Sequence, residues 1–218
     1  MSETRIPVTE NKNSLQRLEN LDGWQVHEND PDVRGWNLYA NGENVGEVKN
    51  LIASTNTEKI QYLEVELNDD TVKNYRNFDY RDSLHNYYQN YYGGDDDKNI
   101  IVPIGMVSLN KNDNQVQASP NLTAQHFSNS PRYGDWNATR ISPLHEVMTV
   151  KYYADHDDNY RQEFNNNDFD LSKEKHYPNL PNRNRFYDSD FFSNQRYLSR
   201  HNNTNPTMSA FKTGMPRR

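Results

Sequence analysis

The residues best suited to chemistry in this sequence are carboxylates and histidines, and residues 155–159 (DHDDN) hold them most densely. Alternating side-chain oxygens of this kind open a calcium-binding loop. Tyr160 stands where such a loop needs glycine for its sharp turn, and Asn166 where it needs a bidentate glutamate. We therefore reject a calcium loop and interpret the run as a solvated acidic segment. Loose cation binding there or at residues 95–97 is the alternative.

The other ionisable residues complete no catalytic pattern. The seven histidines lack the His-X-X-X-His spacing that places two imidazoles beside one metal ion, and the pair His145-Glu146 needs a partner for acid–base catalysis. The sequence contains no cysteine, which excludes disulfides, thiolate catalysis and cysteine metal sites. We predict no enzymatic activity, no cofactor and no metal site. An unrecognised enzyme that uses Asp79, Asp82 and residues 95–97 is an alternative.

Arg34 follows two aspartates, Asp30 and Asp32, and precedes Gly35 and Trp36. These charges are either a binding element or, in the interpretation that we prefer, a structural ion pair that fixes the turn before Trp36. Trp36 itself is predicted to lie in the core, with a partner-binding role at a barrel mouth as the alternative.

The elements that would position these residues are mostly short strands. Apolar residues alternate on both sides of Asn41-Gly42, which is a strong hairpin signal because both positions tolerate a positive φ. Gly46 within the next strand indicates a bulge or a close backbone approach. Residues 60–67 form a further strand, in which Glu64 and Glu66 are expected to lie on a solvated face.

A second block of strand signals covers residues 99–118. Pro103 favours an edge strand or a bulge, Gly105 interrupts the run, and strands resume on either side of a turn at residues 112–114. Helical spacing predicts a short helix or a turn at residues 14–21, with Ser14 as its cap. It also predicts short helices at residues 122–127, where Thr123 can act as the cap, and from Pro143 through Tyr152. Many short strands and few helices predict a mainly β chain with short flanking helices, folded as a small antiparallel β-barrel or as a sandwich.

The two blocks resemble the PRC-barrel domain, which is named for the cytoplasmic part of the photosynthetic reaction centre H subunit. The similarity lies in DVRGW at 32–36, NG at 41–42, VGEV at 45–48, LI at 51–52, YLEV at 62–65 and VPIG at 102–105. It covers roughly residues 15–133 and implies a strongly bent barrel that serves protein contacts. The shared residues, among them Asp32, Arg34, Gly35, Gly46, Pro103 and Gly105, are implied to serve folding. The sequence has no membrane helix like that of the reaction-centre subunit, and residues 72–98 are a long insertion.

This insertion is rich in tyrosine, a residue that anchors many interfaces. Its candidate partner-binding residues, together with Trp36, are Tyr80, Tyr87, Tyr88, Tyr91 and Tyr92. The predicted organisation is a flexible N-terminus (1–13), a PRC-barrel-like domain (14–135), a helical extension (136–154) and a low-complexity, disordered or extended tail (155–218).

Charge and hydropathy divide the chain in the same way. After Asp170 there are nine Lys/Arg and three Asp/Glu, a net charge of +6, whereas the 15 basic and 28 acidic residues before it give −13. An acidic body with a basic tail favours a protein partner, including a second copy of the chain, over nucleic acid. The alternative is a tail that binds RNA or an anionic surface. A polar N-terminus and the lack of any long apolar run predict a cytoplasmic protein without a transmembrane segment.

Overall fold

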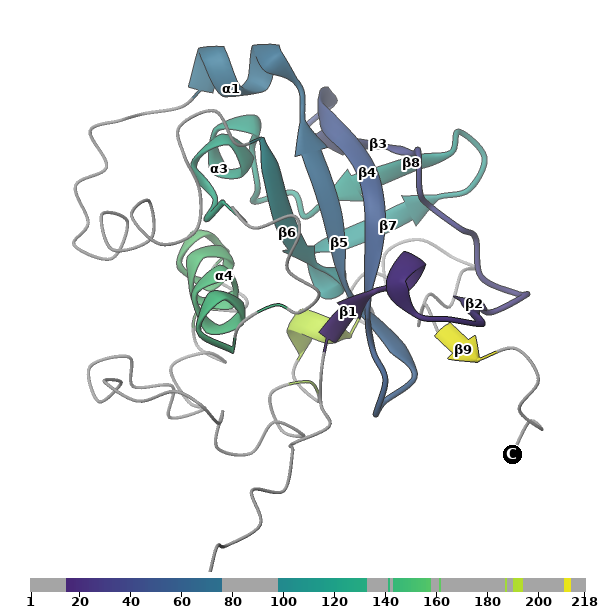
Figure 1. The fold of residues 1–218 in the computed structure, drawn as a ribbon. Helices are drawn as coiled ribbons and strands as arrows, with labels where there is room; N and C mark the ends of the chain where they lie inside the picture. Colours follow the sequence, from purple (N-terminus) through teal and green to yellow (C-terminus); the bar gives the residue numbers. More distant parts are fainter. Residues whose placement is uncertain are drawn as a thin grey trace, which may run out of the picture.

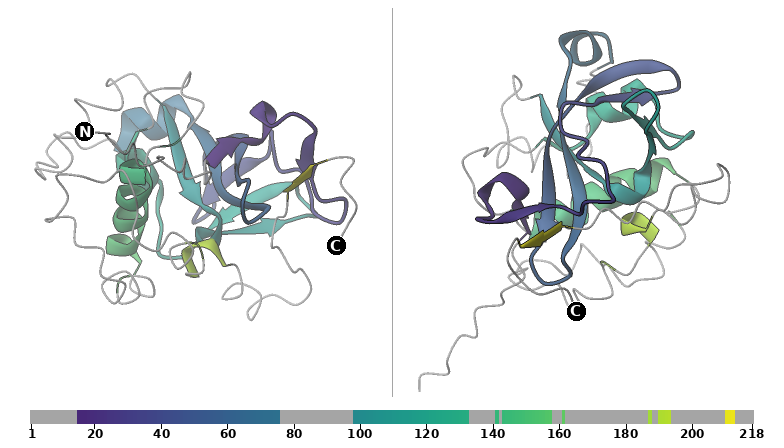
Figure 2. Two further views of the ribbon diagram at one scale, coloured as in Figure 1. Left: turned by 60° about the horizontal axis from the view of Figure 1, so that its bottom comes forward. Right: turned by 90° about the vertical axis from the view of Figure 1, so that its right-hand side faces the viewer.

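The structure is a computed structural model of the chain, and it describes residues 15–75, 98–132, 141, 143–157, 161, 187, 190–193 and 210–212. These residues are mainly β, and seven strands form one sheet that curls into a half-barrel (Figures 1 and 2). The strands are β1 (Leu15–Arg17), β2 (Trp24–Val26), β3 (Asn37–Ala40), β4 (Glu43–Ser54), β5 (Lys59–Leu67), β6 (Asn99–Pro103), β7 (Val107–Asn110), β8 (Gln115–Ala118) and β9 (Ala210–Lys212). The helices are α1 (Asp69–Tyr75), α3 (Ala124–Asn129) and α4 (Pro143–His156).

The order of strands in the sheet is β6-β5-β4-β3-β8-β7, and β1 pairs with the far end of the long strand β4. The hairpin predicted at Asn41-Gly42 joins β3 to β4, with φ angles of 51° and 85°. Pro103 lies on β6, an end strand of this order, as an edge position requires. Gly105 lies in the 3₁₀ turn Ile104–Met106, which separates β6 from β7.

The prediction of a purely antiparallel sheet is wrong at one place, because β3 and β8 pair in parallel. These strands come from the two separate sequence blocks and are not joined by a hairpin, so nothing local forces them to run in opposite directions. No pairing between the end strands β6 and β7 is present in the described part of the sheet, which therefore stays open.

Gly46 shows both features that a glycine within a strand indicates. Leu38 pairs with Gly46 while its neighbour Tyr39 pairs with Asn44, so β4 carries an extra residue, Val45, at this point. A Cβ on Gly46 would lie 2.4 Å from the carbonyl oxygen of Glu66. The close approach of β5 therefore leaves room for glycine alone.

The expectation that Glu64 lies on a solvated face is wrong. Its side chain is 3% exposed and accepts two hydrogen bonds from Arg17 of β1, whereas Glu66 is half-buried. For residues 14–21, where a short helix or a turn is expected, the structure has β1 and the 3₁₀ turn Leu18–Asn20, so the turn is present and the α-helix is not. Pairing of β1 with β4 buries Leu15 and Leu18 and outweighs their helical spacing.

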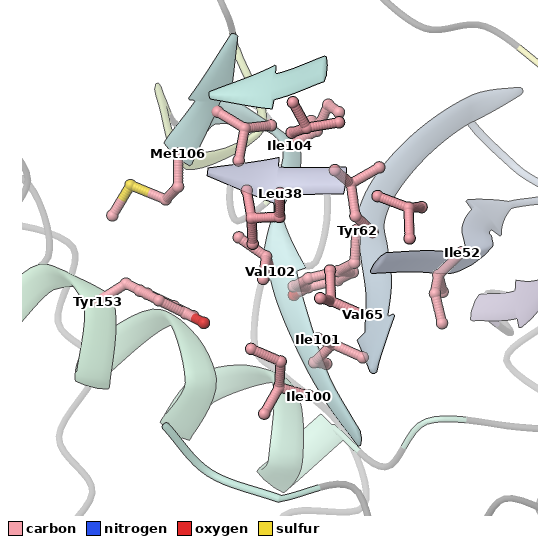
Figure 3. Packing of buried hydrophobic residues seen from close by; sticks show 14 of the residues in the cluster. Leu38, Ile52, Tyr62, Val65, Ile100, Ile101, Val102, Ile104, Met106 and Tyr153 are labelled. Atoms are coloured by element: carbon pink, nitrogen blue, oxygen red, sulfur yellow. The ribbon is translucent and has the colours of Figure 1, made fainter. Parts of the chain in front are cut away.

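Helices α3 and α4 lie on one side of the sheet (Figure 1). Thr123 precedes α3 and donates its backbone N–H to Nδ1 of His126, so the predicted cap is present. Tyr153 points from α4 toward β6 and is fully buried (Figure 3). None of the described helices is long and apolar enough to cross a membrane.

Most of the predicted tail lies outside the described residues. Where the structure describes it, the chain returns to the body in two places: Tyr187, Phe191 and Phe192 are buried in the core, and β9 pairs with β2. The composition of the tail did not predict these contacts.

Candidate interaction surface

The turn before Trp36 is held by the ion pair that the sequence predicts. Nε of Arg34 donates to both carboxylate oxygens of Asp32 at 2.9 and 3.1 Å. Burial raises the pKa of Asp32, but the hydrogen bonds and charge of Arg34 outweigh it, so the pKa is lowered. Gly35, at φ +83°, then donates to the carbonyl of Val48 at 2.8 Å, so the ion pair lies in a turn whose backbone is bound to β4.

The sequence-predicted partner-binding residues are placed only in part. Trp36 is half-buried and packs against the core, and its carbonyl accepts a hydrogen bond from the N–H of Val48 at 2.9 Å. Its role toward a partner stays a prediction. Tyr80, Tyr87, Tyr88, Tyr91 and Tyr92 lie outside the described residues, and their role also stays a prediction.

The outer face of the sheet carries a row of polar side chains, one from each of six neighbouring strands. Their strand neighbours Val65, Val48, Leu38 and Val116 are fully buried, so the row faces away from the core. Strand register places its members opposite one another in the order Asn99, Glu66, Glu47, Asn37, Gln115 and Asn110.

The part of this face over β3, β8 and β7 has no ionisable carboxylate or amine. We define the neutral face as Asn37 and Tyr39 on β3, Gln115 and Gln117 on β8, and Ser108 and Asn110 on β7. Register aligns Tyr39, Gln117 and Ser108 in a second row beside the first. Nε2 of Gln117 donates to Oε1 of Gln115 at 2.9 Å, and Asn110 binds the following turn through Asp113. Amide groups here offer both donors and acceptors.

The part over β4 and β5 is charged and slightly hollow. A shallow cavity of about 230 Å³ lies around Gly46, lined by Asn37, Asn44, Gly46, Glu47, Lys49, Glu66, Leu67 and Asn68. Glu47 and Glu66 lie opposite each other, and Nζ of Lys49 reaches both, at 2.9 and 3.3 Å. The hydrogen bond that Lys49 donates to Glu47 is the main reason that the pKa of Lys49 is raised. Lys49 thereby balances two carboxylates that would otherwise repel.

Two of the residues first considered for metal binding or catalysis, Asp157 and Glu146, make structural contacts, whereas Asp79, Asp82 and residues 95–97 lie outside the described residues. Asp157, from the calcium-loop-like stretch, is buried at the end of α4 and accepts hydrogen bonds from Ser119 and Asn121 at 2.7 and 3.1 Å. Glu146 is buried and accepts the hydroxyls of Tyr62 and Tyr187 at Oε1. No group of three metal-ligating side chains is found in the described parts of the chain.

Sequence reasoning did not identify the neutral face. The sequence offered one indication of this face, because side chains two residues apart in a strand lie on the same side. Asn37 and Tyr39 form one such pair, and Gln115 and Gln117 form another. That the two pairs share a surface depends on the parallel pairing of β3 with β8.

A scan against models of known protein families found no match to this chain, and a search of curated proteins found none either.

Proposed function

We propose that this chain is a non-enzymatic protein-interaction module of the PRC-barrel type, and that the neutral face is its docking surface. The partner is a protein, either a second copy of the chain or another protein. The observation that carries the proposal is the alignment of uncharged amides, a serine and Tyr39 across β3, β8 and β7.

The composition of the neutral face supports this use. The centres of protein interfaces are depleted of charged residues and enriched in tyrosine. Asparagine is disfavoured in strands, so Asn37 and Asn110 do not contribute to folding through strand propensity. Asn37 is exposed and the other members are half-buried, which leaves their polar groups close to the surface.

Strand β7 beside this face offers a second element of recognition. It is the last strand of the sheet order, and no further strand of the described chain pairs with it. An unpaired edge can accept an added strand, whose backbone supplies affinity while adjacent side chains supply specificity. A partner strand on β7 would lie next to Ser108 and Asn110.

The resemblance to the PRC barrel supports the same class of function. Its first block of motifs supplies the turn at Asp32–Gly35 and strands β3 to β5, and its second block supplies β6 to β8. The curled sheet of the mainly β chain is compatible with that architecture. That the fold is a PRC-type barrel is part of what we propose.

The test places a charge in the neutral face of the full-length protein. Asn37→Arg puts a guanidinium on the β3 side of the face, at its most exposed member, and Asn74→Arg makes the same change at an exposed position of α1. We expect the wild type and Asn74→Arg to associate with a protein partner, measured by sedimentation velocity for self-association and by crosslinked capture from the native cell. We expect Asn37→Arg to weaken that association at least tenfold. A strictly monomeric wild type that captures nothing would refute the proposal, and so would equal association of both variants.

A further inference from the structure

The buried aromatic residues of the C-terminal stretch meet the body at one well-defined place. Tyr62 on β5 pairs with Pro103, directly before the 3₁₀ turn Ile104–Met106, and its hydroxyl donates to Glu146 on α4 at 3.2 Å. We call Tyr62, Glu146 and this turn the Tyr62–Glu146 site. The short helical turn Asp190–Phe192 packs against the turn Ile104–Met106.

Three side chains of the stretch are held there by different interactions. The ring of Phe192 meets the ring of Tyr62 edge-to-face, with centroids 5.2 Å apart, and the ring of Tyr187 at 5.1 Å. The hydroxyl of Tyr187 donates to Oε1 of Glu146 at 2.5 Å, the same oxygen that accepts from Tyr62 at 3.2 Å. Phe191 is 2% exposed. Glu146 thus holds Tyr187 through one carboxylate oxygen, and the ring of Tyr62 contacts Phe192.

The spacing of the anchors is that of a helical peptide ligand. Tyr187 and Phe191 are four residues apart, and Phe192 follows directly. In a helix, residues four positions apart, such as Tyr187 and Phe191, lie on the same side, a spacing that groove-binding amphipathic helices use. The site that receives them is formed by β5, α4 and the β6–β7 turn, which belong to the body of the fold.

We propose that the Tyr62–Glu146 site is a binding site for an aromatic peptide with a Tyr-X-X-X-Phe-Phe pattern, and that residues 187–193 are its intrachain ligand. The residues between Arg161 and Tyr187 number 25. Because residues 187–193 are covalently joined to the body, their binding is intramolecular and is governed by an effective concentration. The segment therefore competes strongly with a free peptide while it is attached, and a free peptide can replace it once it is cut.

The experiment starts from the folded full-length chain, with a protease recognition sequence placed between Arg161 and Tyr187. After cleavage, the C-terminal fragment is exchanged for a fluorescent copy of itself, and the dissociation constant is measured by anisotropy. We expect the body to keep its β-sheet circular dichroism after cutting and the labelled fragment to bind it saturably. The uncut chain should bind the same fragment at least tenfold more weakly.

Variants of the labelled fragment test the anchors separately. Phe192→Ala removes the ring contact and should weaken binding at least tenfold, and Tyr187→Phe, which removes only the hydroxyl, should weaken it severalfold. The control is Tyr75→Phe in the body, which removes a phenol that donates to Glu43 outside the Tyr62–Glu146 site. This variant should bind the labelled fragment as the unchanged body does. Loss of the body's fold on release of the fragment would overturn the proposal, since the stretch would then be an inseparable part of the core. Binding that is indifferent to Phe192→Ala and Tyr187→Phe would overturn it as well.

Discussion

Arg17 of β1 and Glu64 of β5 form a bidentate ion pair across β4, and this ion pair joins the two strands that flank the far end of β4. Nε and Nη2 of Arg17 donate to the two carboxylate oxygens of Glu64, at 2.8 and 2.7 Å. Both side chains are largely buried, at 12% and 3% exposed. The short strand β1, only three residues long, is thus held to the sheet by side chains as well as by its ladder with β4.

Removing one member of this pair should cost far more stability than removing both. Glu64→Leu leaves the guanidinium of Arg17 buried without its carboxylate, and such losses cost about 3 to 5 kcal/mol. The double variant Arg17→Met/Glu64→Leu has no buried charge left to compensate, so we expect its cost to be about 1 kcal/mol. Urea denaturation of the full-length protein measures the free energy of unfolding in each case. If the double variant lost as much free energy of unfolding as Glu64→Leu, or more, the expectation would be contradicted.

The error about Glu64 shows where sequence reasoning stops. Alternation in residues 60–67 correctly predicts the strand and the two sets of side chains, but it cannot show that a separate segment covers the polar set. That cover is β1, which pairs with β4 at residues that are at least 35 positions away along the chain, as in Arg17 with Ile52. The hairpin, the α3 cap and the bulge at Gly46 were predictable because each depends on neighbouring residues.

The candidate surface was less accessible to prediction for the same physical reason. Each strand reveals its own polar side, such as Gln115 and Gln117, but not which strand lies beside it. The parallel pairing of β3 with β8 depends on how the two blocks pack, a tertiary relationship with no local turn to encode it. The docking of Phe191 and Phe192 depends likewise on the site formed by Tyr62 and Glu146.

Gly46→Ala should be one of the most destabilising single-methyl additions in the chain. The new Cβ would lie 2.4 Å from the carbonyl oxygen of Glu66 and 2.9 Å from the Cα of Leu67, so backbone atoms of β5 would have to move. We expect a loss of about 2 to 3 kcal/mol or more in the free energy of unfolding, measured in urea.

Gly42→Asn is the control for Gly46→Ala. Gly42 has open space around it at φ +85°, a conformation that asparagine tolerates, so this change should cost less than about 1 kcal/mol. Equal costs would show that β5 yields readily at Gly46.

Asp157→Ala should loosen the end of α4. The carboxylate is fully buried and accepts hydrogen bonds from Ser119 and Asn121, so its removal leaves two polar groups without this acceptor. Loss of such a buried acceptor costs about 1 to 3 kcal/mol of the free energy of unfolding.

The control is Asp155→Ala, two residues earlier. It removes an exposed ion pair with Lys151 and should change the free energy of unfolding by no more than about 0.5 kcal/mol. Hydrogen exchange of α4 amides should increase in Asp157→Ala alone. Similar exchange in the two variants would argue against this anchor.

Mild acid should destabilise the protein through His145. This side chain is fully buried, and burial lowers its pKa from 6.5 to about 4 because the charged imidazolium loses its hydration. Above pH 6.5 the imidazole is neutral in both the folded and the unfolded chain, so its contribution to stability is complete there. As the pH falls toward 4, the unfolded chain binds a proton that the folded chain does not, and the free energy of unfolding falls. The difference between the two pKa values corresponds to a loss of about 3 kcal/mol across this window. His126, whose pKa is lowered by burial and by the charge of His156, contributes in the same direction.

The variant His145→Leu removes the titrating group. Urea denaturation at several pH values should show the free energies of unfolding of wild type and variant converging as the pH falls below 6.5, with a constant difference between pH 7 and 8. Parallel curves from pH 8 to 4 would show that His145 does not carry this dependence.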